Sequence, residues 1–540
     1  AKLVRKDEKP GWFYKKTEPF YLAMENGYED YLKGFLKIRW VTGLILMACI
    51  AAIVFLFKLL PQELAPLEDR ESINLSMTAP EGTSYENMDA YILKVAKFIK
   101  DSVPENTAIL TVTAPGFAGS GGLNTGFGRI KLNESSKRKR SQQEIADYIS
   151  MNTKGMNEAK VFVIQQQTIS TGASRGLPLQ YVIQNNNFDK IKEKLPLFLE
   201  KANSDPAFVA VDVNLKFSKP ELSLIIDRDK AQNLGVSVMD IAQTLQLSLS
   251  GQRFGYFTKD GKQYQVIGQF DRANRDQPLD LSITYVRNNR GELIQLDNLV
   301  KMEETSSPPQ LFHYDRFKSA TVSAAPAPGT TIADGIKAMD RISKEVLDES
   351  FSTSLSGASR DFAESSSNTI FALLLALALV FLILSAQFES FVDPIIIMMT
   401  VPLALAGALF SLWYFNESLN IFSQIGIIML IGLVTKNGIL IVEFANQLKE
   451  KGLSKGDAIL EASKMRLRPI LMTSLATSLG ALPIAMSFGD AAKSRMGMGI
   501  VVVGGVLFSL VLTLFVIPAI YSYFSREPKH TEENETSTFN

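Results

Sequence analysis

The chain has 540 residues, 46% of them hydrophobic, and its 56 basic and 56 acidic side chains give a net charge of zero. A neutral chain without a basic stripe has no electrostatic field to gather nucleic acid, which argues against nucleic-acid binding. The single cysteine, Cys49, excludes an internal disulfide and a thiolate metal site within this chain. The two histidines, His313 and His530, lie far apart in sequence, so no His-based catalytic or metal centre is expected.

The leading segment and six apolar stretches set the topology. Residues 1–38 are rich in Lys and Arg and resemble neither a signal peptide nor a spanning helix, so we expect a cytoplasmic linker segment. The first residue is Ala1 rather than Met, which indicates a piece of something longer. Crossing a hydrocarbon core of about 30 Å takes roughly 20 helical residues. Six stretches qualify: 39–59, 368–386, 394–415, 421–445, 469–488 and 499–523.

The large polar region between the first and second spans contains an internal repeat. Residues 60–174 predict a βαββαβ unit, with strands at 73–79, 108–114, 126–132 and 160–166 and helices at 84–102 and 141–156. The same order recurs in 175–219 and 310–360, with strands at 177–184, 209–216, 318–325 and 351–356 and helices at 188–202 and 332–346. Residues 220–309 interrupt it with hairpin signals at Asp260-Gly261 and Asn288-Asn289-Arg290-Gly291. We expect two ferredoxin-like units with a small α+β insertion, and a ligand cleft between the two sheets.

The distribution of basic residues predicts which side of the membrane each connecting segment faces. The leading segment and the loop 446–468 carry the excess of Lys and Arg, so both are predicted to be cytoplasmic. The tail 525–540 then returns to the cytoplasm, and the large polar region faces the other side of the membrane. The predicted fold class is therefore an α+β membrane protein, with a six-helix transmembrane bundle and ferredoxin-like units outside the membrane.

Lys436 is the residue most strongly marked for function. It lies near the middle of the span 421–445, where a charged Lys costs about 2.5 to 3.5 kcal/mol on insertion scales. Glu443, the nearest acid, is about 10 Å further along the same helix. Lys436 is therefore either deprotonated by desolvation, or paired with a carboxylate from helices that this chain lacks, and we favour the second. The alternative is that the Lys436 side chain snorkels to a membrane interface, but the depth of Lys436 in the span argues against snorkelling.

Three further residues near the membrane are weaker candidates. Thr473 offers a hydroxyl to a polar network, or bonds back to its own helix backbone. Arg466 and Arg468 are expected at the cytoplasmic mouth, in either a topology-setting or a proton-path role. Because the sequence lacks a GxxxxGK[ST] run, energy for transport would come from an ion gradient rather than from ATP bound by this chain.

The runs GLVTKNGILIVEFA (432–445) and RLRPILMTS (466–474) resemble the resistance-nodulation-division (RND) superfamily, in its hydrophobe and amphiphile efflux, or AcrB-like, branch. The resemblance covers essentially the whole chain and matches the second half of such pumps. It implies two porter subdomains, a docking subdomain at 220–309 and a proton relay at Lys436, Asn437, Arg466 and Thr473. Heavy-metal pumps usually carry an acidic residue where this chain has Lys436, which favours an organic substrate.

The resemblance also implies partners and a location. It implies a multi-pass protein of the bacterial inner membrane with a large periplasmic region, working as a proton antiporter rather than an enzyme. The implied partners are an N-terminal half carrying paired membrane aspartates, two further copies in a homotrimer, a periplasmic membrane-fusion adaptor and an outer-membrane channel. Amphiphilic small molecules such as drugs or detergents would be the cargo, and no cofactor is implied.

A glycine-rich loop in the first unit matches the family's switch loop. Gly116, Phe117 and Gly119 belong to this loop, which we expect to be mobile, and Phe162 is a further aromatic at the implied substrate pocket. Positions that are phenylalanine in pumps of broad range are Thr111, Pro115 and Arg129 here. A narrower or more polar substrate range is therefore a hypothesis.

Two other functions stay open. A protein of the same superfamily could present lipid to a partner instead of expelling a drug, because a cleft opening to the bilayer suits either task. A half-protein could also bind a complete transporter without moving substrate. The pump interpretation requires a second six-helix half upstream.

Overall fold

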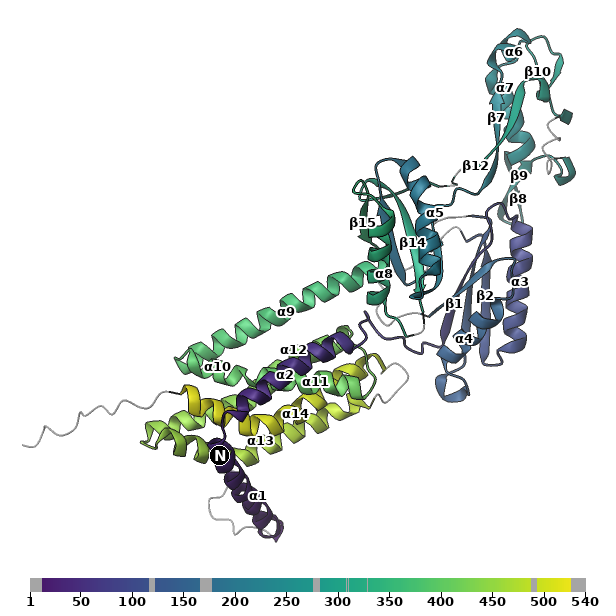
Figure 1. Cartoon of the computed structure of the whole chain (residues 1–540). Coiled ribbons are helices and arrows are strands. Elements are labelled where there is room, and N and C mark those ends of the chain that lie inside the picture. The colour runs from purple at the N-terminus through teal and green to yellow at the C-terminus, as the bar shows by residue number, and fades with distance from the viewer. Residues whose placement is uncertain are drawn as a thin grey trace, which may run out of the picture. The chain divides into compact units, whose positions relative to one another are not determined.

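The fold is described from a computed structural model of the chain (Figure 1). The described residues are 12–115, 122–165, 177–274, 282–306, 308, 310–327, 329–486 and 493–525. They form two compact units, one comprising Ala1–Asn214 with Phe312–Asn540, the other Leu215–Leu311.

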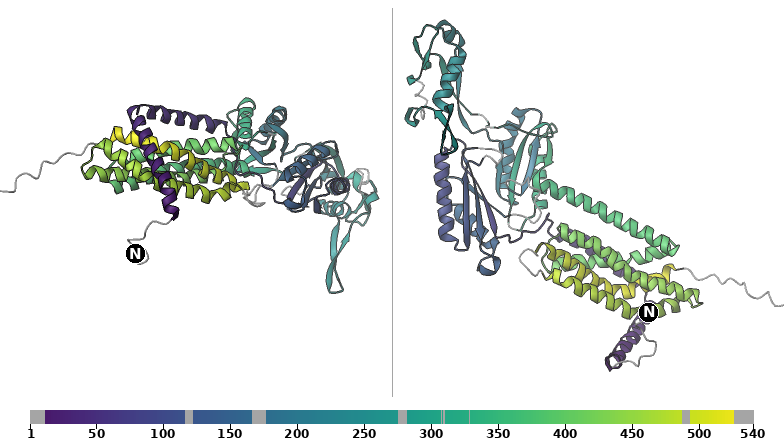
Figure 2. Two further views of the ribbon diagram at one scale, coloured as in Figure 1. Left: turned by 90° about the horizontal axis from the view of Figure 1, so that it is seen from below. Right: turned by 180° about the vertical axis from the view of Figure 1, so that it is seen from behind.

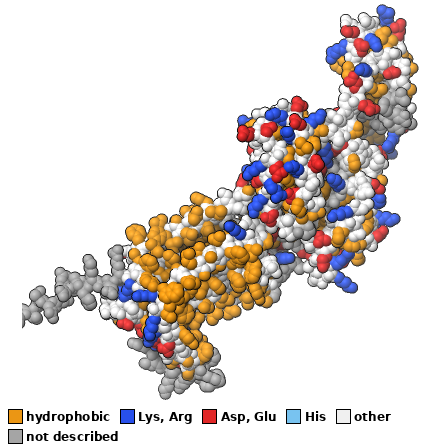
Figure 3. Space-filling model, viewed as in Figure 1, with side chains coloured by type: hydrophobic (Ala, Val, Ile, Leu, Met, Phe, Trp, Pro, Cys, Tyr) orange, Lys and Arg blue, Asp and Glu red, His pale blue; other side chains and the backbone are white. Residues whose placement is uncertain are grey.

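Six helices among the described residues are long and apolar enough to cross a membrane, as predicted. They are α2 (Val41–Leu59), α9 (Gly357–Phe388), the pair α10 (Val392–Met398) and α11 (Thr400–Tyr414), α12 (Ile421–Glu450), α13 (Lys455–Ala485) and α14 (Lys493–Phe524). Hydrophobic side chains cover much of the visible bundle surface, whereas charged side chains gather over the sheet-bearing parts (Figure 3).

Several helices extend beyond the predicted spans. The predicted loop 446–468 is almost entirely helical, because α12 continues to Glu450 and α13 begins at Lys455. Charged residues there lower the hydropathy but favour a helix, so the limits of the apolar stretch are not the limits of the helix. At the other end of the bundle, α9 begins at Gly357, well before the predicted span at 368.

The leading segment forms a helix that the sequence interpretation left out. Helix α1 (Trp12–Lys37) is 26 residues long and precedes α2 in the chain. Its Tyr28 and Leu32 are buried and join the hydrophobic core of the bundle with residues of α12, α13 and α14. The segment is therefore a packed element and not only a linker.

The first sheet unit has the predicted βαββαβ order. Its elements are β1 (Ser72–Thr78), α3 (Tyr85–Ser102), β2 (Asn106–Thr113), β3 (Thr125–Leu132), α4 (Gln142–Thr153) and β4 (Lys160–Gln165). The strands form an antiparallel sheet in the order β2-β3-β1-β4. Alternate residues of β1 are buried in the same core as α3 and α4, so both helices cover one face and leave the other uncovered.

The second sheet unit repeats this arrangement. Its elements are β5 (Leu179–Gln184), α5 (Phe188–Ser204), β6 (Phe208–Val213), β14 (Phe317–Pro326), α8 (Ile332–Val346) and β15 (Ser352–Leu355), with a short extra strand β13 (Phe312–Tyr314). Strand β14 pairs with β6 and β5, and β5 pairs with β15, so the strand order matches that of the first sheet unit. The sequence repeat therefore reflects a structural repeat.

The other compact unit interrupts the second repeat. It contains β7 (Pro220–Ile226), α6 (Arg228–Asn233), α7 (Val238–Leu245), β8 (Gln252–Lys259), β9 (Lys262–Gly268), β10 (Tyr285–Arg287), β11 (Leu293–Gln295) and β12 (Val300–Ser306). Asp260 and Gly261 both have positive φ and join β8 to β9 in the predicted hairpin. The second predicted turn joins β10 to β11.

Helix α14 lies at the centre of the bundle. It contacts α11, α12 and α13, and these four helices run side by side in Figures 1 and 2. Its close approach to α13 depends on Gly499, where an added Cβ would lie 2.3 Å from the backbone nitrogen of Ala485. Small residues that let helix backbones approach are a general basis of packing within membranes.

This contact gives a stability prediction. We expect Gly499→Ala to destabilise the protein by about 1 to 3 kcal/mol, because backbone atoms of α13 must move to admit the methyl group. The measurement is the thermal midpoint of the purified full-length protein in detergent. Gly480→Ala in α13 is the matched control, since its added Cβ would meet nothing in this chain within 4 Å. Equal midpoints for the two variants would contradict the packing account.

Candidate functional site

Helix α12 carries Lys436 near the middle of its 30 residues. The helix begins at a capping box, in which the side chain of Asn420 accepts hydrogen bonds from the backbone nitrogens of Phe422 and Ser423. No Gly or Pro breaks it between Ile439 and Glu450, and its apolar residues continue past Lys436 in both directions. The charge is therefore held within the apolar length of the helix, as the sequence predicts.

Lys436 lies on the exposed face of α12. Ile425, Met429, Gly432 and Lys436 are all exposed and recur at spacings of four, three and four residues, which places them on one side of the helix. The neighbouring residues Thr435 and Asn437 are buried. Among the described residues, no carboxylate forms an ion pair with Lys436. The lysine thus faces away from the bundle that this chain builds.

Asn437 connects α12 to α13. Its side-chain nitrogen donates a hydrogen bond of 3.1 Å to the hydroxyl of Ser474, and both residues are buried. The hydroxyl of the adjacent Thr473 donates instead to the backbone carbonyl of Ile470 at 3.2 Å. The interhelical bond is therefore made by Ser474, which the sequence analysis did not select, because hydroxyls one residue apart differ only in the helix face they occupy.

Arg466 and Arg468 have different environments on α13. The guanidinium of Arg466 stacks on the ring of Phe444 at 4.4 Å, and its Nε is buried without a hydrogen-bond partner among the described residues. Arg468 pairs with the carboxylate of Glu18 at 3.1 Å and stacks on Tyr21 at 4.3 Å, both in α1. Arg466 thus keeps an unused donor, while Arg468 holds α1 to the bundle.

Other contacts complete the docking of α1. Lys464 of α13 pairs with Glu29 at 2.6 Å, and the hydroxyl of Tyr28 donates to the backbone carbonyl of Leu514 in α14 at 2.5 Å. Hydrogen bonds from Lys33 and Lys464 lower the pKa of Glu29 to about 2 from an ordinary 4.5. Because the folded-state pKa is lowered, the stabilisation from this carboxylate is complete at pH values above the ordinary 4.5 and is lost as the pH falls towards 2. The Glu29 carboxylate therefore stays charged at every physiological pH.

Only part of the predicted substrate region can be placed. Gly116, Phe117 and Gly119 lie outside the described residues. Phe162 of β4 is half-buried on the face of the first sheet unit that α3 and α4 leave uncovered, and it lies opposite Ser76 of β1. Phe127 of β3 lies opposite Ser76 from the other side, which puts both rings on this uncovered face. The alternation in β3 could have identified Phe127 from the sequence.

The uncovered face also carries a polar pair. Arg129 stands two residues after Phe127 and donates a hydrogen bond of 3.0 Å to the side-chain oxygen of Asn74. Arg129 lies on the same face of the sheet as Phe127 and Phe162. This face is therefore more polar than one that carries only aromatic rings.

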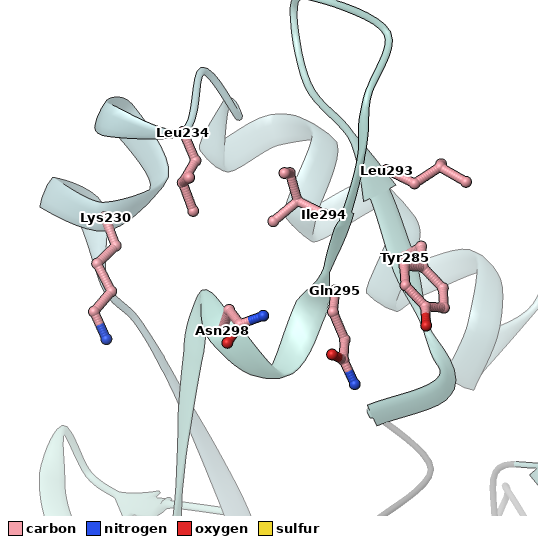
Figure 4. Close-up of a pocket in the computed structure, with 7 residues that line it drawn as sticks. All are labelled: Lys230, Leu234, Tyr285, Leu293, Ile294, Gln295 and Asn298. Carbon is pink, nitrogen blue, oxygen red and sulfur yellow. The ribbon is translucent and has the colours of Figure 1, made fainter.

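A shallow pocket in the inserted unit, Leu215–Leu311, contains few groups that could bind or react with a ligand. Lys230, Leu234, Tyr285, Leu293, Ile294, Gln295 and Asn298 line it (Figure 4). It is open to solvent, and the charged Lys230 already pairs with Asp227 at 3.8 Å. Among the described residues, no group of His, Cys, Asp and Glu could hold a metal ion.

A prediction follows for the docking of α1. Glu29→Gln should speed amide hydrogen exchange in α1 by about two- to fivefold at pH 7, because the neutral amide keeps the shape of the side chain but loses the ion pair with Lys464, whose contribution solvent keeps small. Asp30→Asn is the control, since in the described part of the chain this neighbouring exposed carboxylate forms no ion pair with Lys464. Unchanged exchange in Glu29→Gln would show that the pair does not hold the helix.

Comparisons with known proteins place the chain among membrane transporters. The model of the AcrB/AcrD/AcrF family matches residues 1–525. An uncharacterized transporter of Haemophilus influenzae is 30% identical over 551 residues, covering 99% of this chain and 52% of the relative. Multidrug resistance protein MdtC of Escherichia coli is 28% identical over 542 residues, covering 96% of this chain and 52% of the relative, and MdtC of Escherichia fergusonii matches equally well. The chain spans about half the length of these relatives.

Proposed function

The chain belongs to the AcrB/AcrD/AcrF family, and we propose that it is one half of a proton-driven exporter of amphiphilic organic compounds in the bacterial inner membrane. The multidrug resistance proteins among its relatives support this substrate class. The half-length match supports a second half that completes the transporter. On this account the protein is an antiporter driven by the proton gradient and not an enzyme.

The observation that carries the proposal is the exposed face of α12. A charged lysine among apolar residues is expensive in lipid, so the face containing Met429, Gly432 and Lys436 needs a protein neighbour with a counter-charge. Gly432 lies one turn before Lys436 and has no atom of another part of this chain within 4 Å of where a Cβ would be, so a neighbouring helix can approach closely there. Spanning helices of the second half would supply it.

The counter-charge proposed for Lys436 is a pair of aspartates on a helix of the second half. Two carboxylates beside one lysine titrate as a unit, so taking up a proton weakens their hold on the ammonium. Lys436 would then be released and captured once in each cycle, and each change would favour a different arrangement of the helices. Asn437, Arg466 and Thr473 remain proposed relay residues, and the unused Nε of Arg466 supports a further polar partner.

Substrate would be handled outside the membrane. We assign it to the uncovered face of the first sheet unit, where Phe127 and Phe162 offer rings and Arg129 a charge. The proposed switch loop is Gly116, Phe117 and Gly119. A homotrimer joined to a periplasmic adaptor and an outer-membrane channel would carry the compounds across the envelope.

Replacing Lys436 tests the proton step. Lys436→Ala in the full-length transporter should lower the rate of substrate efflux at least about tenfold at normal expression, because the carboxylates lose the partner whose release drives the cycle. The measurement is efflux of a fluorescent dye from cells, together with substrate-dependent proton flux in proteoliposomes.

Lys58→Ala is the matched control for this experiment. Lys58 is an exposed lysine in the last turn of α2, near the end of a span rather than at its middle. Efflux in this variant should stay at the wild-type rate. Normal efflux and proton flux in Lys436→Ala would refute the proposed relay.

A second experiment tests the substrate face. Phe162→Ala should increase the susceptibility of expressing cells to aromatic apolar drugs by about two- to tenfold, because an aromatic pair between Phe162 and the drug is worth about 0.5 to 1.5 kcal/mol beyond its buried area. Leu93→Ala, at an exposed position of α3 that the uncovered sheet face does not include, is the control. An unchanged susceptibility profile in Phe162→Ala would remove this face from the proposal.

A further inference from the structure

The segment Pro61–Asp69, here named the strap, connects α2 to β1 and makes contacts far beyond its neighbours in sequence. Its first residues bond to the chain at the beginning of α12. The side chain of Ser418 donates a hydrogen bond to the carboxylate of Glu63. Three backbone hydrogen bonds accompany it. The nitrogen of Leu419 donates to the carbonyl oxygen of Pro61 at 2.8 Å, and the nitrogen of Glu63 donates to the carbonyl oxygen of Leu419 at 3.3 Å. The nitrogen of Ile421 donates to the carbonyl oxygen of Leu64 at 3.2 Å. The helix that carries Lys436 is thus pinned to the strap at its first residue.

The middle of the strap is buried against the second sheet unit. Leu64 is 4% exposed and Ala65 is fully buried. Leu64 packs with Ile332 and Ala333 of α8, and with Phe362 of α9. The same residue therefore contacts the second sheet unit through its side chain and α12 through its carbonyl oxygen.

The last residues of the strap are two adjacent carboxylates, each at the beginning of a helix. Glu68 is 3% exposed, and its carboxylate accepts a hydrogen bond of 3.3 Å from the backbone nitrogen of Ser494, the second residue of α14. The carboxylate of Asp69 accepts one of 3.3 Å from the backbone nitrogen of Gln142, the first residue of α4. Carboxylates at helix N-termini are stabilised by the exposed N–H groups and the helix dipole.

An ion pair between Asp69 and a buried arginine side chain strengthens the second of these contacts. The side chain of Arg138 is only 1% exposed and donates to the carboxylate of Asp69 at 2.5 Å. The amide of Gln142 also donates to the backbone carbonyl of Glu68 at 3.2 Å. The end of the strap is therefore firmly held by the first sheet unit, while Glu68 reaches from it to a membrane helix.

The strap is too short to absorb a movement between these attachments. From Leu64 to Glu68 the chain can extend over at most about 14 Å, and Pro61 and Pro66 restrict its backbone further. A displacement of the beginning of α12 must therefore be passed to Glu68 and Asp69, or break the bonds that hold them.

We infer that the strap transmits movement of the Lys436 helix to both sheet units, with Glu68 as the positioning residue that keeps α14 in register with α4. This inference rests on the proposed function, in which proton exchange at Lys436 moves α12. It goes further by assigning the mechanical link to one segment with attachments in the bundle and in both sheet units. If the strap only joined α2 to β1, transport would not depend on the length of the strap.

The test changes the length of the strap without removing any contact residue. Two glycines are inserted after Pro66 in the full-length transporter, which is reconstituted in proteoliposomes with a fluorescent substrate and an internal pH dye. Substrate efflux should fall about tenfold or more, while proton flux persists and no longer responds to substrate. Glu68→Ala should act in the same direction. The thermal midpoint in detergent should stay near the wild-type value for the insertion.

Matched controls are available in the first sheet unit. The same insertion after Asn157 lengthens an exposed turn between α4 and β4. Glu71→Ala removes a nearby carboxylate whose partner, Lys131 at 2.9 Å, belongs to the first sheet unit, so no membrane helix is released. Both controls should transport at the wild-type rate.

The outcomes separate this inference from the proposed function. Lys436→Ala, measured in parallel, should lose both substrate efflux and proton flux, whereas the strap variants should lose only the coupling between them. Wild-type efflux after the insertion at Pro66 would overturn the strap's role and leave the relay intact. If the insertion abolished both fluxes and lowered the thermal midpoint, the strap would have a purely structural role, and the inference would also be overturned. Normal fluxes in Lys436→Ala would refute the relay and the inference that rests on it.

Discussion

The charge of Lys436 is the constraint on which the rest of this account depends. An ammonium group within an apolar helix must find a counter-charge or water, and the described part of the chain supplies no carboxylate to it. The residues on its face, Met429 and Gly432 among them, leave α12 open on one side. A transporter gains from this arrangement, because a proton and a lysine can compete for the same carboxylates. The unpaired Lys436 is therefore the proposed reason for a second half and also the proposed source of movement.

The contacts around α12 determine where such a movement can go. Asn437 joins the helix to Ser474 of α13, and α1 ties the basic end of α13 to the bundle through Arg468 and Lys464. At its other end α12 is bonded to the strap, which leads to both sheet units. One end of the bundle is thus braced by ion pairs, while the opposite end is connected to the parts proposed to hold substrate. Motion at Lys436 would be expressed mainly at the strap.

Much of the fold follows from sequence patterns with a clear physical cause. The six spans are long and apolar enough to cross a membrane, and the repeated βαββαβ order appears in the sequence because alternation and helical spacing switch at turn residues. In the inserted unit, Asp260 and Gly261 mark the hairpin between β8 and β9. Helix α1 was missed because it mixes charged residues with the apolar ones, and α13 begins earlier than predicted because Lys455 lowers hydropathy without opposing a helix. In the site, Lys436 could be selected from its depth alone. The bond between Asn437 and Ser474 and the contacts of the strap could not, because they join segments that no local pattern connects.

The most direct measurement is an experimental structure of the full-length transporter at neutral pH, resolved well enough to place side chains around Lys436. The account predicts that the ammonium nitrogen lies within about 4 Å of a carboxylate from a helix outside this chain in at least one conformation of the transport cycle. It further predicts that this helix covers Met429 and Gly432. A Lys436 that faces lipid or bulk water in every conformation, with no membrane carboxylate nearby, would contradict it.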